Sequence, residues 1–345
     1  MEYVYLGILI FIFCLAVFDL VIGVSNDAVN FLNSAVGAKS ASFKVILTLA
    51  ALGVFFGAAI SNGMMDVARH GIFQPQHFTF VEIMCILMAV MVTDVVLLDI
   101  FNSMGMPTST TVSLVFELLG GTVALAVVKN IATDGALTYG QMINTDKALT
   151  VVLGIFLSIA IAFFFGLVVQ WIARVVFTFN YKRNLKWFAG IFGGIAVTSI
   201  VYFMLFKGLK DSSFMTPENK IWIQENTTTL LLYIFLGATV LMQILHWLKV
   251  NVFKVVVLLG TFSLAMAFAG NDLVNFIGIP LTGLATYQDY MANGTEVGMD
   301  VFTLDSLNGP ASTPIAYLIG AGAIMVFALV TSKKARNVIN TSLNL

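Results

Sequence analysis

Long apolar stretches alternate with short polar segments along the whole chain. Nine of the apolar stretches come close to the roughly 20 residues that an α-helix needs to cross a bilayer. They cover residues 3–24, 43–60, 80–100, 111–129, 149–173, 187–206, 230–247, 252–269 and 315–330. A further stretch, 276–287, is shorter and contains Gly278, Pro280 and Gly283, which predicts a re-entrant segment that is buried in protein or lines a wet cavity. The pattern predicts an all-α polytopic membrane protein.

The composition supports a chain embedded in a lipid bilayer. Hydrophobic residues make up 59% of the chain and charged residues 10%, against about 25% charged in a typical soluble domain. The mean hydropathy is +0.96. A net charge of −1 leaves no basic surplus to neutralise phosphates, so nucleic acid is excluded as a partner. Cys14 and Cys85 both fall in apolar stretches and indicate neither a disulfide framework nor a metal site.

The first apolar stretch runs directly into a polar segment, Gly23 to Lys39. Its hydrogen-bonding or charged side chains are Ser25, Asn26, Asp27, Asn30, Asn33, Ser34 and Lys39. Because this segment begins near membrane depth, we expect the helix to break there.

Part of the polar segment returns 245 residues later. Residues 268–278, FAGNDLVNFIG, match residues 23–33, GVSNDAVNFLN, through Asn-Asp-x-Val-Asn-Phe. The repeated residues are Asn26, Asp27, Val29, Asn30 and Phe31, and then Asn271, Asp272, Val274, Asn275 and Phe276. An internal repeat of this kind predicts two related halves, each with a polar break in an apolar segment.

Basic residues in the short loops predict how the chain crosses the membrane. The most basic loop, 174–186, is placed in the cytoplasm, whereas the long loop 285–313 holds no Lys or Arg and falls outside. Counting back puts the N-terminus outside, so the two Asn-Asp segments approach from opposite sides. Inverted repeats whose broken or re-entrant helices meet at the membrane midplane are typical of secondary transporters.

Asp27 and Asp272 are candidate cation ligands. An acid at membrane depth costs about 2.5–3.5 kcal/mol and normally faces a partner or water, and clusters of oxygen ligands suit a hard cation such as Na⁺. The candidate cation-binding residues are Ser25, Asn26, Asp27, Asn30, Thr108, Asn271 and Asp272, with sodium placed at Asn26, Asp27, Asn271 and Asp272. Two alternatives stay open: the Asn-Asp pairs cap broken helices, or Asp27 or Asp272 takes a proton in place of Na⁺.

A second polar break, Phe101 to Ser113, contains Pro107 and four consecutive hydroxyl side chains. The hydroxyls belong to Thr108, Ser109, Thr110 and Thr111, directly before a new apolar stretch. Backbone N–H groups at such a helix start attract an anion, and hydroxyls add donors. An ordinary N-cap after a proline turn is the alternative.

Four other acids lie in or near the apolar stretches. Asp19 precedes Gly23 by about one helical turn and could complete a cation site or take a proton, whereas Asp99 is expected at an interface. Asp94 and Glu117 are the remaining two.

At these residues the chain resembles the inorganic phosphate transporter family, the PiT family of cation-coupled phosphate permeases. The resemblance rests on Ser25-Asn26-Asp27-Ala28-Val29-Asn30 and Pro107-Thr108-Ser109-Thr110-Thr111 in the first half, and on Gly270-Asn271-Asp272-Leu273-Val274-Asn275 in the second. It implies Na⁺ symport of inorganic phosphate by alternating access, in a multi-pass cell-membrane protein that forms a homodimer. The phosphate ligands it implies are Asp27, Ser109, Thr110, Thr111, Asp272 and Asn275.

One departure from the family pattern concerns the second half. The partner of Pro107 would fall beyond Leu345, and Pro310-Ala311-Ser312-Thr313-Pro314 is a poor substitute. We therefore expect a fragment of a longer transporter, divided into a first inverted repeat over residues 1–145, connecting helices over 146–250 and an incomplete second repeat over 251–345.

Several alternatives to Na⁺-coupled phosphate transport are consistent with the sequence. An H⁺-coupled phosphate or sulfate permease would use the same fold, whereas an anion channel would need a continuous pore. A non-transporting membrane subunit would tolerate the loss of both repeated acids. An enzyme is not expected, because no constellation of nucleophile, base and metal ligands occurs in the sequence.

Overall fold

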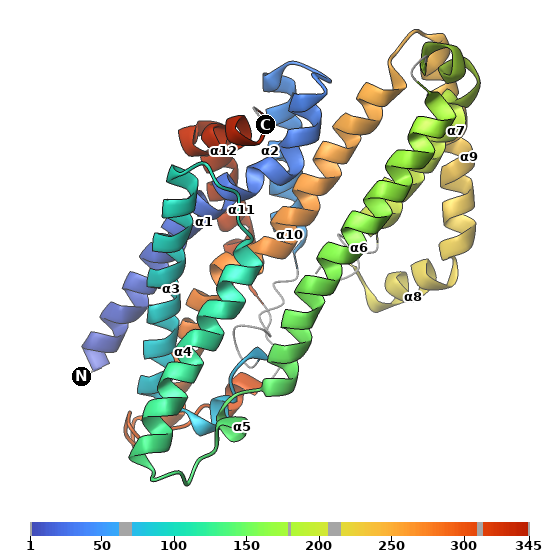
Figure 1. Cartoon of the computed structure of the whole chain (residues 1–345). Coiled ribbons are helices and arrows are strands. Elements are labelled where there is room, and N and C mark those ends of the chain that lie inside the picture. The colour runs from blue at the N-terminus through green and yellow to red at the C-terminus, as the bar shows by residue number, and fades with distance from the viewer. Residues whose placement is uncertain (1, 62–70, 179–180, 206–214, 309–312, 344–345) are drawn as a thin grey trace.

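The computed structural model describes residues 2–61, 71–178, 181–205, 215–308 and 313–343, and this part of the chain is helical throughout apart from its connections (Figure 1). The helices are α1 Glu2–Gly37, α2 Phe43–Ile60, η2 Pro75–His77, α3 Phe80–Ser103, α4 Thr110–Ala132, α5 Tyr139–Met142, α6 Thr145–Phe177, α7 Tyr181–Phe203, α8 Pro217–Glu225, α9 Thr227–Trp247, α10 Val252–Asp289, η4 Tyr290–Gly294, η5 Asp305–Asn308, α11 Ile315–Thr331 and α12 Lys333–Leu343. The prediction of an all-α chain is confirmed.

Each of the nine apolar stretches predicted from the sequence coincides with a helix over its described residues. Within the described residues, eight helices are long and apolar enough to cross a membrane, or nine if the bent pair of α11 and α12 counts as one span. This pair meets at an angle of 64°. The helix breaks at Ser332, whose extended backbone (φ −67°, ψ 123°) ends α11 and whose hydroxyl accepts a 3.2 Å hydrogen bond from Ala335 N at the start of α12.

The helix breaks predicted at the Asn-Asp segments are wrong at those positions. α1 runs unbroken over 36 residues and α10 over 38 residues, so residues 276–287 continue α10 instead of forming a separate re-entrant segment. Polar side chains need no break in their own helix when neighbouring helices supply their hydrogen-bond partners. Pro280 removes one backbone donor but is tolerated inside α10, where it is buried among other helices.

Close backbone contact joins α2 to α10. A Cβ atom added to Gly53 would lie 2.5 Å from Phe262 O, and one added to Gly57 would lie 2.1 Å from Met266 O. Small residues at a crossing let two membrane helices approach until their backbones touch, which maximises van der Waals contact. The glycines of α2 therefore set its distance from α10.

Gly57→Ala is expected to destabilise the protein by about 1–3 kcal/mol, because the new methyl group has no room against the α10 backbone. The midpoint of thermal unfolding in detergent measures the effect. Gly154→Ala on α6 is the matched control, since a Cβ there meets nothing within 4 Å. Equal midpoints for the two variants would contradict this account of the crossing.

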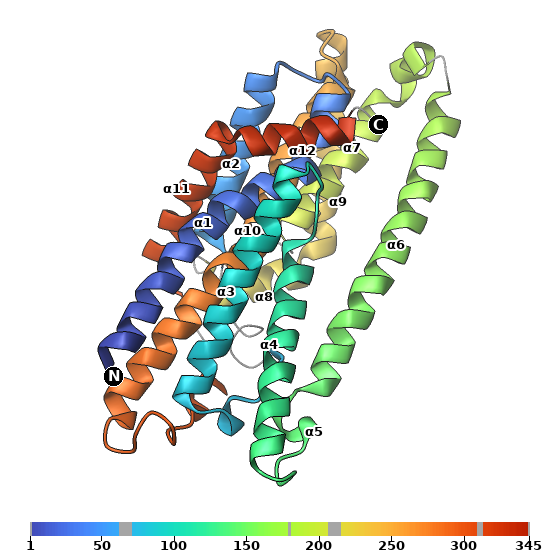
Figure 2. The ribbon, with the colours of Figure 1, turned by 60° about the vertical axis from the view of Figure 1, so that its left-hand side comes forward.

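The two repeats make equivalent contacts with each other. Phe31 packs against Phe268 with ring centroids 6.2 Å apart, and a Cβ on Gly23 would lie 2.2 Å from the Phe276 ring. The offset of 245 residues pairs Gly23 with Phe268 and Phe31 with Phe276. The two contacts are therefore equivalent, with the roles of the two repeats interchanged. Since Leu9 also lies beside Gly283, α1 and α10 run antiparallel, as both views show (Figures 1 and 2).

A second pair of exchanged contacts involves the ends of α2 and α11. The hydroxyl of Ser61, directly after α2, donates a 2.7 Å hydrogen bond to Gly270 O. Ser332, directly after α11, has its hydroxyl 2.9 Å from the Ser25 hydroxyl, and Ser25 is the repeat equivalent of Gly270. Each repeat thus places its second helix against the first helix of the other, which is the arrangement of an inverted repeat.

The connecting helices α6, α7 and α9 stand beside this core (Figures 1 and 2). α7 and α9 pack closely, because Gly193 and Gly194 face Met242 and Thr239 across their crossing. α6 is different, since none of its most apolar 18-residue window is buried within the chain. Cys14 and Cys85 are free thiols.

Candidate functional site

A cavity of about 440 Å³ opens where α1, α10 and the start of α4 meet. Its lining consists of Asp27, Asn30, Pro107, Thr108, Ser109, Thr110, Thr111, Phe268, Asn271 and Asp272. Most of the residues proposed from the sequence therefore come together, although 80 residues separate Asp27 from Pro107. None of these lining residues of the described chain is basic.

The two repeated acids meet at the cavity. Asp27 and Asp272 are each only 5% exposed, and their carboxyl groups adjoin each other. Ionised carboxylates are acceptors only, so two adjoining ones repel unless a proton or a cation offsets their charge. The geometry is consistent with the cation site predicted at this pair, and the identity of its ligands stays a prediction.

Two threonines of the first turn of α4 hold the acid pair. Thr110 lies beside Asp27, and the Thr111 hydroxyl donates to Asp272 Oδ1 at 3.4 Å. Two consecutive threonines of α4 thus each contact the acid of one repeat. These contacts hold the start of α4 against both α1 and α10.

Ser109 is the N-cap of α4, and its hydroxyl accepts a 3.3 Å hydrogen bond from Val112 N. The N-cap alternative is therefore confirmed for this residue, and it coexists with a place in the cavity wall. The positive end of the α4 dipole and the hydroxyls of Thr108 to Thr111 therefore lie at the same cavity as the two carboxyl groups. A helix N-terminus of this kind attracts anions, and the anion site stays a prediction.

The asparagines of the two repeats occupy different positions. Asn30 and Asn271 are exposed and line the cavity, whereas Asn275 is 7% exposed and lies behind the wall. The Asn275 amide donates to Thr111 Oγ1 at 2.9 Å and to Thr110 Oγ1 at 3.4 Å. Asn275 therefore positions the threonine hydroxyls, and its role as a direct phosphate ligand stays a prediction.

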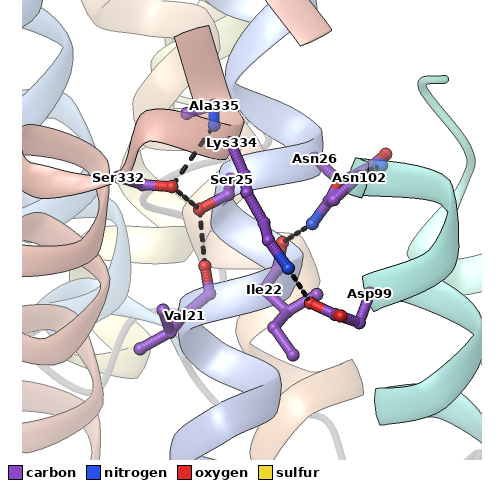
Figure 3. Close-up of polar contacts among 9 residues, drawn as sticks. All are labelled: Val21, Ile22, Ser25, Asn26, Asp99, Asn102, Ser332, Lys334 and Ala335. Carbon is purple, nitrogen blue, oxygen red and sulfur yellow. Dashed lines mark hydrogen bonds and ion pairs between the residues drawn. The ribbon is translucent and has the colours of Figure 1, made fainter. Parts of the chain in front are cut away.

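Asn26 and Ser25 do not line the cavity. Asn26 Oδ1 accepts from Thr108 N at 2.7 Å, while its amide donates to Asn102 Oδ1 at 2.6 Å and to Met106 O at 3.1 Å. Ser25 lies between Val21 O and the Ser332 hydroxyl (Figure 3). Their roles as cation ligands stay predictions; the contacts they make hold the segment before α4 and the α11–α12 break.

Asn102 is a buried residue to which the sequence assigned no role. Its amide donates to Ile22 O at 2.7 Å (Figure 3), so that α3 is bonded to α1 in both directions through Asn102 and Asn26. The sequence signal was an asparagine five residues before Pro107, inside an apolar helix.

Asn102→Ala is expected to destabilise the protein by about 1–3 kcal/mol, because Ile22 O and the Asn26 amide each lose a buried partner. Phosphate uptake should fall as well, since the segment before α4 loses its anchor on α1. Thermal unfolding and uptake, each compared with the exposed control Asn340→Ala on α12, measure the two effects. An unchanged unfolding midpoint would rule out this structural role.

α12 contacts α3 close to Asn102 through an ion pair. Lys334 forms an ion pair with Asp99 of α3 (Figure 3). Both side chains are about half exposed, at 44% and 45%, so the pair contributes about 0–1 kcal/mol. Residues 310–312, part of the weak second-half hydroxyl motif, lie outside the described residues.

Comparison with known proteins places the chain among transporters. The model of the "Phosphate transporter family" matches residues 23–341. A solved structure, "The sodium-dependent phosphate transporter", superposes with a TM-score of 0.70 at 18% sequence identity, covering 98% of this chain and 78% of that chain. The search of curated protein sequences gave no match. The solved structure shares the fold, and the family match over most of the sequence shows that the chain belongs to the phosphate transporter family, a family of transporters and not of enzymes.

Proposed function

We propose that the protein carries inorganic phosphate across the cell membrane together with Na⁺, by alternating access to the cavity between α1, α4 and α10. The observation that carries this proposal is the pair of adjoining acids, Asp27 and Asp272, in a cavity that also presents the N-terminus of α4. The solved structure with the same fold is described as sodium-dependent, which supports Na⁺ as the coupling ion.

The charges of the cavity explain why the cation and the anion depend on each other. Phosphate is an anion, and the described cavity wall offers it two acids and no basic residue. Cations bound at Asp27 and Asp272 remove this repulsion, and the bound phosphate in turn favours the cations. Each ligand therefore raises the affinity for the other by the same factor, as linkage requires.

The proposed ligands divide between the two sides of the cavity. When Na⁺ occupies the acids, Thr111 turns its single hydroxyl proton from Asp272 to phosphate. Thr110 and Ser109 donate to phosphate oxygens beside it at the start of α4, with Asn275 behind them. Asp27 and Asp272 hold Na⁺. Further oxygen ligands come from Asn30, Thr108 and Asn271, which line the cavity, and from Ser25 and Asn26, which were predicted from the sequence. A carboxylate can also accept the proton that phosphate still carries, which disfavours sulfate.

H⁺ coupling is the second candidate, because one shared proton would equally relieve the contact between the Asp27 and Asp272 carboxyls. A homodimer with its N-terminus outside and loop 174–186 in the cytoplasm completes the proposal. The unburied apolar window of α6 offers surface for a second copy or for lipid.

Uptake of labelled phosphate into proteoliposomes tests the proposal. The expected result is saturable uptake that a Na⁺ gradient drives and that excess sulfate does not block. Uptake driven by a proton gradient and indifferent to Na⁺ would replace Na⁺ with H⁺, and sulfate competition would replace phosphate with a broader class of anions. Uptake that neither saturates nor needs a cation would indicate a channel, and no uptake under either gradient would contradict transport.

A further inference from the structure

A second group of acids lies inside the helix bundle, apart from the cavity. Asp19 on α1 is 0% exposed and Asp94 on α3 is 1% exposed, and Glu117 on α4 stands beside them with Ser113 of the same helix. Asp19 precedes Asp27 by eight residues on α1, which is about 12 Å along a helix. None of these residues lines the cavity between α1, α4 and α10.

The four side chains form a continuous chain of short contacts. Ser113 Oγ lies 2.9 Å from Asp94 Oδ1 and 2.8 Å from Glu117 Oε1. The carboxyl of Asp19 adjoins that of Asp94. Among the described residues, no amide or hydroxyl donor reaches either oxygen of Asp19 or Oε2 of Glu117, although these atoms are buried.

The contacts among these four side chains need more protons than are present when all three acids are ionised. A serine hydroxyl carries one proton, so Ser113 can donate to Asp94 or to Glu117 but not to both. The other contact needs a carboxyl that carries its own proton. Asp19 and Asp94 adjoin as two buried carboxyls, which repel each other unless one of them is protonated. Three contacts with one serine proton therefore require two further protons on the acids.

Among the described residues, no basic side chain supplies this balance. The ion pairs of the described residues are Lys129 with Glu82 and Lys334 with Asp99, and neither involves the buried acids. The acid whose charge acts on Asp19 from outside the group is Asp27, which adds repulsion. The acids also do not converge as a set of three metal ligands in the described part of the chain.

We propose that Asp19, Asp94, Ser113 and Glu117 form a second buried site whose ligand is the proton. Ser113 and Glu117 line a groove of about 600 Å³ between α3 and α4, which gives one end of the chain an opening. Glu117 passes a proton to Ser113 Oγ as the Ser113 hydroxyl proton moves to Asp94, and Asp94 passes its proton to Asp19. One O–H bond forms for each that breaks, so protons move from the groove to a point two turns from Asp27.

Infrared spectroscopy of the purified protein in lipid nanodiscs tests this site directly. Protonated carboxyl groups show a carbonyl stretching band that ionised carboxylates lack, and the measurement is made at neutral pH in sodium-free buffer. Asp19→Asn and Glu117→Gln each supply an amide N–H as the donor in place of one protonated carboxyl. Each variant should therefore reduce the band area by the signal of one carboxyl group. The exposed control Glu296→Gln should leave the band unchanged.

A serine variant and the addition of Na⁺ separate protonated acids from ionised acids and from a sodium site. Ser113→Ala retains all three acids and removes one hydrogen bond, so it should shift the band without reducing its area. An unchanged band area in both amide variants would overturn the proposal, because the acids would then be ionised. Na⁺ should displace any proton held by Asp27 and Asp272 without touching this group. Loss on addition of Na⁺ of the part of the band that Asp19→Asn and Glu117→Gln remove would therefore also overturn the proposal, by making the group a sodium site. The spectra need no phosphate uptake, so protonation is tested separately from the proposed function, on which any role of these protons in transport rests.

Discussion

Asp27→Asn is expected to lower Na⁺-stimulated phosphate uptake by about 30-fold or more, and Asp272→Asn should do the same. Removing one partner from a buried charged contact costs about 2–5 kcal/mol, and about 1.4 kcal/mol corresponds to a factor of ten in binding. Asparagine keeps the shape of the side chain but not the charge that attracts Na⁺. The two variants should be equally impaired, because the acids are equivalent in the two repeats and equally buried. Initial uptake rates across a range of Na⁺ concentrations measure the loss.

Two controls make the loss specific. Asp300→Asn removes an exposed acid from the loop after α10 and should leave uptake unchanged. Exchange of external for internal phosphate needs no net proton movement, so under H⁺ coupling the asparagine variants should keep exchange, since asparagine mimics a protonated acid. Loss of both uptake and Na⁺-stimulated exchange supports sodium at the pair. Full activity of both variants would show that the acids are structural.

Thr111→Val is expected to raise the phosphate concentration for half-maximal uptake by about 10- to 150-fold, and Thr110→Val should act similarly. A hydrogen bond to a charged group contributes about 1.5–3 kcal/mol, which gives this range. Valine is close to threonine in shape but removes the hydroxyl at the wall that faces the anion. Saturation curves for phosphate at a fixed, saturating Na⁺ concentration measure the effect.

The matched control is Thr150→Val on α6, which removes an exposed hydroxyl far from the cavity lining. The proposed division of ligands predicts that the threonine variants change the dependence on phosphate more than the dependence on Na⁺. The opposite result, with a weakened Na⁺ dependence and an unchanged phosphate dependence, would assign the hydroxyls to the cation.

The membrane spans could be predicted because hydropathy is a local property. α2 has the same bounds as the apolar stretch 43–60, because a polar residue, Ser42 or Ser61, flanks the stretch at each end. The same local signal failed at the ends of α1 and α10, where polar residues follow apolar ones within one helix. A run of Ser, Asn and Asp is consistent with a break or with a buried polar face, and tertiary partners decide between them.

Those partners are distant in sequence, which is why the continuity of α1 could not be predicted. Asn26 is satisfied by Asn102 and by the backbone around Met106, 76 and 80 residues further on. The pairing of Ser25 with Ser332 spans 307 residues. No periodicity within a window of the sequence reports such contacts.

The candidate site was easier to predict than these supports. The repeat pairs Asp27 with Asp272 through a single offset along the chain, and Pro107 with its hydroxyls marks the start of α4. Which asparagines face the cavity could not be predicted, because Asn30 and Asn275 occupy equivalent places in the sequence and differ only in what packs around them.

The exchange of partners between the repeats also determines where this protein can bend. α2 is locked to α10 backbone against backbone, and α11 packs against α1 and α2, so these four helices make one mechanical block drawn from both ends of the chain. The halves of the sequence are therefore not the moving parts. We expect bending instead between this block and the segment leading into α4, which is held to α1 by side-chain hydrogen bonds such as Asn26 to Asn102 and not by backbone packed against backbone.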